Sequence, residues 1–182
     1  FFELDKILKI KNLNKKYIKE KNYLYGVHGN DKRPLDIEIK DLSRIHWIVL
    51  KRKPLNILEF GSGFSTIILA DACSILNKYV LKLLPKFRAK KNFHVYSIEE
   101  SKYFGKLTQK KLNNELKKFV TINYTKHKLI VYNNRYATLA SKLPNIAPDF
   151  IYLDGPSQQA TNDKINGFSI NEIHRFPMSA DL

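Results

Sequence analysis

The chain has 182 residues, of which 43% are hydrophobic, so it is long enough to bury the core of one globular domain. It contains no apolar run of membrane-spanning length and no charged-then-apolar leader, so we expect a soluble, cytoplasmic protein without membrane contact. Cys73 is the single cysteine, which excludes an internal disulfide. The formal net charge of +15 makes nucleic acid a partner to consider.

The basic residues occur in short groups spread over predicted helix faces and loops, in a chain that is also rich in Ile and Asn. Charge runs of this kind are usually solvated surfaces. We therefore do not favour a nucleic-acid partner, although the net charge keeps one possible.

The first third of the chain predicts helices. Residues 4–25 mix lysine with apolar residues in a helical pattern. Asp41 is placed to cap a second helix that ends before Pro54 and whose apolar side carries Leu42, Ile45, Ile48 and Val49. We expect residues 1–53 to form a helical segment that packs on a domain of residues 54–182.

Residues 57–66 (ILEFGSGFST) predict a buried strand that turns through two glycines directly into a helix. Gly61 and Gly63 let the backbone pass close to a ligand, and the free amides at the helix start can point at it. A dinucleotide site would require a third glycine where this chain has Thr66. Glu59 would also place a carboxylate beside a pyrophosphate, whereas S-adenosylmethionine has no phosphate and carries an ammonium and a sulfonium.

This pattern resembles the class I S-adenosylmethionine-dependent methyltransferases, whose first motif is an acidic residue, one spacer and Gly-x-Gly. Glu59, Gly61 and Gly63 hold those places, and Ser65 holds that of a third small residue. The Ser65-Thr66 pair is similar to the small O-methyltransferase-like branch. The resemblance implies a Rossmann-like domain that binds S-adenosylmethionine, with its methionyl part near Glu59, Gly61, Ser62, Gly63 and Ser65.

Residues 66–84 keep helical spacing and predict a helix that covers the sheet, and residues 93–100 (FHVYSIEE) predict a strand ending in acid. In the family, the acid that closes the second strand accepts hydrogen bonds from both ribose hydroxyls. By position this is Glu99, with Glu100 as second choice. Glu99 lies further from Gly63 along the chain than the roughly 20 residues that separate the glycine turn from the ribose-binding acid in a dinucleotide fold. A long first helix and a loop over residues 82–92 would explain the difference.

A second covering helix is predicted over residues 103–119. The third strand has two candidates, residues 120–124 and 129–132, between which the sequence does not decide.

Residues 148–156 form an apolar run ending in Asp-Gly and resemble the family's fourth strand, after which the residues facing the acceptor usually lie. Asp154 is therefore the candidate catalytic residue.

Strands alternating with helices predict an α/β fold with a doubly wound, mostly parallel sheet. The resemblance implies about three strands beyond the fourth, where residues 170–182 predict only a helix interrupted by Pro177. We expect a domain truncated after its fourth strand, with the remaining strands on a longer protein or supplied by another chain, for example in a homodimer.

Methyl transfer from a sulfonium is an in-line displacement that mainly requires positioning, and a base helps when the acceptor is a hydroxyl. Asp154 could be that base, or only a turn carboxylate that bonds nearby amides. In metal-dependent O-methyltransferases an Asp at the matching position binds magnesium, but the partner ligands come from the segment that is missing here. No histidine pair has metal-ligand spacing, which disfavours a zinc site, and we name no metal-binding residue.

The predicted function is transfer of a methyl group from S-adenosylmethionine to a small-molecule or sugar hydroxyl. An RNA methyltransferase is the alternative that the charge supports. A Rossmann protein that binds NAD or a nucleotide sugar is a second alternative, and a non-catalytic methyltransferase-like module is a third.

Overall fold

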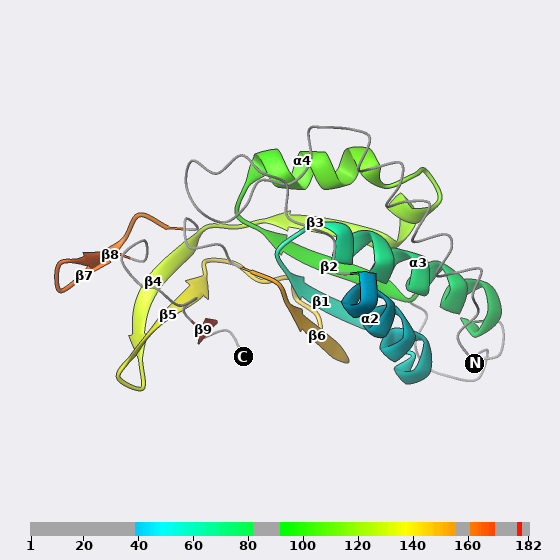
Figure 1. The fold of residues 1–182 in the computed structure, drawn as a ribbon, viewed down its shortest axis with the longest axis horizontal. Helices are drawn as coiled ribbons and strands as arrows, with labels where there is room; N and C mark the ends of the chain where they lie inside the picture. Colours follow the sequence, from blue (N-terminus) through cyan, green and yellow to red (C-terminus); the bar gives the residue numbers. More distant parts are fainter. Residues whose placement is uncertain (1–38, 82–91, 156–160, 170–177, 180–182) are drawn as a thin grey trace.

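The computed structural model describes residues 39–81, 92–155, 161–169 and 178–179 (Figure 1). In chain order the elements are α2 (Ile39–Arg52), β1 (Asn56–Phe60), α3 (Phe64–Tyr79), β2 (His94–Glu99), α4 (Lys102–Lys111), the 3₁₀ helix η2 (Leu116–Phe119), β3 (Val120–Tyr124), β4 (His127–Tyr132), β5 (Arg135–Ala140), β6 (Phe150–Leu153), β7 (Lys164–Ile165), β8 (Phe168–Ser169) and β9 (Met178–Ser179). The helix predicted over residues 4–25, the loop over 82–91 and most of the helix predicted over 170–182 lie outside the described residues.

Four strands form one parallel sheet in the order β3-β2-β1-β6. In its centre Ile57 of β1 is in register with Val95 of β2 on one side and Phe150 of β6 on the other. The predicted fold class, an α/β fold with a parallel sheet flanked by helices, is confirmed. The described residues after β6 add no strand to this sheet, because β7 pairs with β8 and β9 pairs with β5.

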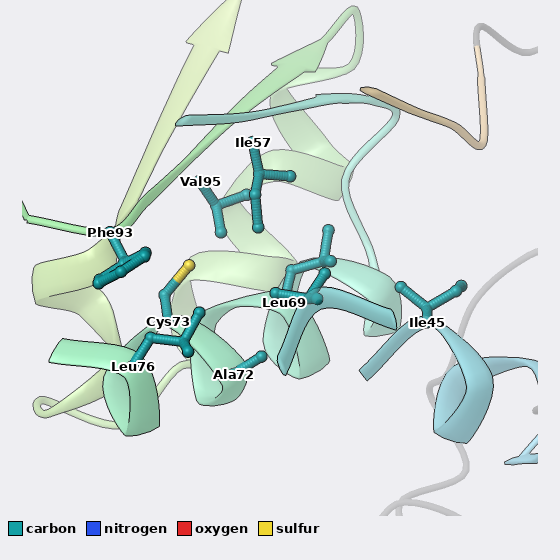
Figure 2. Close-up of a cluster of buried hydrophobic side chains, with 9 residues drawn as sticks. Ile45, Ile57, Leu69, Ala72, Cys73, Leu76, Phe93 and Val95 are labelled. Atoms are coloured by element: carbon teal, nitrogen blue, oxygen red, sulfur yellow. The ribbon is translucent and has the colours of Figure 1, made fainter. Parts of the chain in front are cut away.

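The main core lies between one face of this sheet and the helices α2 and α3. Alternate residues of a strand point to the same face, so β1 and β2 contribute Ile57 and Val95 to this core. Figure 2 shows Cys73, Phe93 and Val95 meeting between α3 and the sheet. The fully or nearly fully buried members of this cluster are Ile45, Val49, Ile57, Leu69, Ala72, Cys73, Leu76, Phe93 and Val95. Each large aliphatic or aromatic side chain buried here contributes about 1.5–3 kcal/mol, so this packing holds α3 against β1 and β2.

The structure decides between the two candidates for the third strand. Residues 120–124 form β3, which joins the parallel sheet, whereas β4 pairs antiparallel with β5. Strands β4, β5 and β9 form a separate sheet, which extends away from the parallel sheet (Figure 1). Asn133 and Asn134 both have positive φ, 49° and 58°, as the tight type I′ turn of a hairpin requires.

The second covering helix is shorter than predicted. Helix α4 ends at Lys111, and Leu112 has an extended backbone with ψ of 123°. The side chain of Asn113 then accepts a hydrogen bond from the Leu116 amide (2.8 Å) and starts η2. An asparagine side chain that bonds its own backbone competes with helix continuation, and the apolar periodicity across residues 103–119 does not reveal that competition.

Helix α2 begins at Ile39, two residues before Asp41, so Asp41 lies inside the first turn and is not the cap that the sequence predicts. A carboxylate there still interacts favourably with the helix dipole. The helix ends at Arg52, and Lys53 takes a left-handed conformation before Pro54. In the described part of the chain no helix is long and apolar enough to cross a bilayer.

Candidate cofactor site

The loop between β1 and α3, residues 61–63, is here called the glycine turn, and it lies where three parallel strands end. The Gly61 amide donates to the Ile98 carbonyl of β2 (2.8 Å), and the Asp154 amide after β6 donates to the Phe60 carbonyl of β1 (2.9 Å). In open parallel sheets, ligands bind at this carboxyl end of the strands.

The two glycines of the turn have different surroundings. Gly61 has φ of +88°, and a Cβ there would lie 2.9 Å from the Asp154 carbonyl oxygen, so protein backbone fills that position. Gly155 belongs to the same close contact, since its own Cβ position would lie 3.1 Å from the Gly61 Cα. A Cβ on Gly63 would meet nothing within 4 Å. Only Gly63 therefore leaves space for a ligand to approach the backbone.

Glu59 lies beneath the turn and is connected to it through Thr66. The Thr66 hydroxyl donates to Glu59 Oε2 (2.6 Å), and the Gly63 amide donates to Thr66 Oγ1 (2.9 Å). Glu59 and Thr66 are both fully buried. Thr66, which replaces the third glycine of a dinucleotide motif, thus holds the acid and the turn together as one unit.

Burial raises the pKa of Glu59 to about 7, and the hydrogen bond from the Thr66 hydroxyl opposes this rise. The buried Oε1 atom has no hydrogen-bond partner among the described residues. Ser65 and Ser97 do not bond it, because Ser65 donates to Asp154 and Ser97 donates to the Gly61 carbonyl, each at 3.3 Å. An unsatisfied, desolvated carboxyl oxygen is stabilised by any cation placed near it.

Glu99 is 3% exposed and bonds the other side of the turn. Its Oε2 accepts hydrogen bonds from the Ser62 amide (2.9 Å) and the Ser62 hydroxyl, and its Oε1 accepts one from the Ser101 amide (2.8 Å). Burial raises the pKa of Glu99, and the bonds from Ser62 and Ser101 partly offset the rise. A carboxylate has about four acceptor positions, so accepting two ribose hydroxyls would require the Ser62 hydroxyl to turn away.

Asp154 follows β6 at the exposed rim of the turn, where Oδ2 accepts a hydrogen bond from the buried Ser65 hydroxyl (3.3 Å). Protein atoms packed around the carboxyl group desolvate it and raise its pKa, although much of the residue's surface stays exposed. A carboxylate with a raised pKa at a rim is suited to accept a proton from a bound hydroxyl.

The structure therefore brings all the predicted site residues to one place: Glu59, Gly61, Ser62, Gly63, Ser65, Glu99 and Asp154. Among the described residues, no basic side chain forms an ion pair with any of the three carboxyls. Nor does any group of three His, Cys, Asp or Glu in this part of the chain have the arrangement of a metal site. Such a turn suits a cationic ligand and disfavours a phosphate.

Sequence reasoning missed Thr66, Ser97 and Gly155 as parts of this network. Thr66 enters the sequence analysis as the residue in place of a third glycine and as half of the Ser65-Thr66 pair, but not as a partner of Glu59, although a hydroxyl seven residues after a buried acid is a signal for the bond between them. Ser97 and Gly155 gave no local signal, because their contacts with Gly61 join segments far apart in the sequence.

Comparison with known proteins finds no family model and no curated protein that matches the chain. A search of solved structures finds a partial likeness to an O-methyltransferase of Streptomyces achromogenes involved in tomaymycin synthesis, in complex with S-adenosylmethionine. The two are 22% identical, with a TM-score of 0.36 over 48% of this chain. The match covers 34% of the length of that O-methyltransferase.

Proposed function

We propose that the chain binds S-adenosylmethionine at the glycine turn and acts as a methyltransferase. The observation that carries this proposal is the open backbone at Gly63 beside three desolvated carboxyls, those of Glu59, Glu99 and Asp154. A ligand that carries two positive centres and no phosphate would relieve their desolvation, whereas a pyrophosphate would increase their repulsion.

The residues present fit this cofactor, because Gly63 provides a space that a Cβ would fill and Glu59 Oε1 is an orphaned acceptor. When bound, S-adenosylmethionine would supply an electrophilic methyl group on its sulfonium. Glu99 would bind the ribose hydroxyls, and Glu59 would hold the turn through Thr66 and favour the ammonium. Ser62 and Ser65 would line the turn.

The acceptor class that we favour is a small-molecule or sugar hydroxyl. Asp154 lies at the rim of the turn with its backbone fixed by Phe60 and its side chain by Ser65. It would accept the proton that the hydroxyl loses as the oxygen attacks, and its raised pKa makes it a stronger base than an ordinary aspartate.

Isothermal titration calorimetry with S-adenosylmethionine, its demethylated product and NADH tests the proposal. We expect micromolar binding of the first two, and a loss of about tenfold or more in Glu99→Gln, since a hydrogen bond to a charged group is removed. Glu100→Gln is the matched control, because it removes one charge from the adjacent residue, and it should bind nearly as the parent does. Circular dichroism melts check that both variants fold.

Absence of heat with both adenosyl ligands, or tight binding of NADH alone, would overturn the cofactor assignment. Equal loss of S-adenosylmethionine affinity in Glu99→Gln and Glu100→Gln would leave the cofactor assignment standing but contradict the role of Glu99 in binding the ribose.

A further inference from the structure

A second candidate site lies at the opposite edge of the sheet from β6. A cavity of about 450 Å³ opens between α4, η2 and the edge strand β3. This volume falls in the range of small-molecule pockets. None of the residues that line it belongs to the glycine turn or to its hydrogen-bond network.

The walls of the cavity carry one sign of charge. Lys106 and Lys110 are one helical turn apart on α4, and Lys117 faces the same space from η2. All three are exposed, and no acidic side chain lines the cavity. None of the three forms an ion pair within the part of the chain that the structure describes.

Lysines in the last turn of a helix can be explained by the helix dipole, which accounts for Lys110. It accounts in the same way for Lys117, which lies in the last turn of the short helix η2, but not for Lys106, which lies in the middle of α4. Like charges four residues apart repel each other, and an anion between them removes that repulsion. Lysine is a common phosphate ligand as a point charge.

The floor of the cavity is apolar and consists of Leu112, Val120 and Ile122, with the Gln109 amide at its side. Branched aliphatic side chains of this kind accept the face of a flat ring, and an amide can donate to or accept from the ring's edge. We propose that this cavity binds a small phosphorylated molecule with a flat body, such as a nucleoside monophosphate. The lysines would hold the phosphate and the floor would hold the ring.

Calorimetry on the whole chain with uridine 5′-monophosphate and with uridine tests this proposal. Neither ligand contains adenosine, so neither should compete for the proposed S-adenosylmethionine site. We expect the monophosphate to bind at least about tenfold more tightly than the nucleoside, since only the monophosphate can bond the lysines. The triple variant Lys106→Gln, Lys110→Gln, Lys117→Gln should lose this difference. The control Lys128→Gln, Lys142→Gln, Lys164→Gln removes the same charge from exposed positions elsewhere and should keep it.

Equal binding of nucleoside and monophosphate, no binding of either, or equal losses in the two triple variants would overturn the proposal. Binding of an oligouridine strand without binding of the monophosphate would also overturn it, in favour of a nucleic-acid surface. The cavity variant should bind S-adenosylmethionine as the parent does, so failure of the cofactor proposal and failure of this one give different results.

Discussion

Gly61 and Gly63 are the same residue type two positions apart, but they have different surroundings. Gly61 is required by the fold, because its φ is +88° and the Asp154 backbone occupies the place of its side chain. Gly63 has an extended φ of −175° and an empty Cβ position, so no contact in the described structure requires the absence of a side chain there. The two glycines can therefore be separated by mutation.

We expect Gly61→Ala to lower the free energy of unfolding by at least about 2 kcal/mol, because it combines a strained φ with a backbone clash. Gly63→Ala should change stability by about 1 kcal/mol or less, but should weaken S-adenosylmethionine binding about tenfold or more, since the new methyl group would occupy the ligand's space. Urea denaturation and calorimetry measure the two effects. Unchanged cofactor affinity in Gly63→Ala would show that the ligand does not contact this position.

Glu59 should make stability depend on pH. Its pKa is about 7 in the folded chain against 4.5 as the ordinary value, so the folded state binds more protons between these values. Its stabilising contribution is complete below about pH 4.5 and is lost as pH rises through 7. Between about pH 5 and pH 8 the parent should therefore lose about 3 kcal/mol relative to Glu59→Gln, which remains neutral. Parallel denaturant titrations of both proteins would show no such divergence if Glu59 ionises normally.

At the scale of elements, α2 and α3 are joined by a polar contact as well as by the apolar core. His46 of α2 is 5% exposed, and its Nε2 lies 2.9 Å from Asp71 Oδ2 of α3. The chain also has an exposed pair within α2, Arg44 and Asp41, at 3.1 Å. Buried polar groups lose more than exposed ones when a partner is removed, because water cannot replace it.

We expect Asp71→Ala to cost about 1–3 kcal/mol of unfolding free energy, since it leaves the buried His46 ring nitrogen unsatisfied. Arg44→Ala breaks the exposed pair within α2 and should cost about 0.5 kcal/mol or less. Thermal or urea unfolding of the two variants provides the comparison. Equal losses of unfolding free energy in the two variants would mean that the His46–Asp71 contact does not stabilise the packing of α2 on α3.

For the molecule as a whole, charge is distributed unevenly. The chain carries a formal net charge of +15, yet the glycine turn is surrounded by carboxyls and the cavity beside α4 by lysines. A net charge of this size destabilises the compact state by self-repulsion, which dissolved salt screens.

We therefore expect the melting temperature to rise when ionic strength increases from about 0.01 M to about 0.1 M, over which the screening length falls from about 30 Å to about 10 Å. For a chain of this size, a gain of 1 kcal/mol corresponds to about 2–4 °C. Circular dichroism melts in sodium chloride measure the shift, and melts in sodium sulfate at equal ionic strength serve as the control for specific ion effects. A melting temperature that is constant or falls would contradict net repulsion.

The sequence by itself determined the parallel core of the fold and the location of the candidate site. Residues 57–66 predicted the strand, the turn and the helix start, and β1, α3 and the glycine turn are formed there. These features follow from local chemistry, because apolar periodicity sets burial and glycine sets backbone freedom.

Only the tertiary structure decided what the site residues contact. It placed the backbone of Asp154 against Gly61, connected Glu59 to Gly63 through Thr66, and joined Ser62 to Glu99 across two strands. It also placed the lysines of α4 and η2 around one cavity. Apart from the local connection of Glu59, Thr66 and Gly63, these contacts cannot be deduced from a single sequence, because they join segments that become neighbours only when the chain folds. The raised pKa values of the acids arise in the same way, since desolvation is a property of the packed molecule rather than of any one segment.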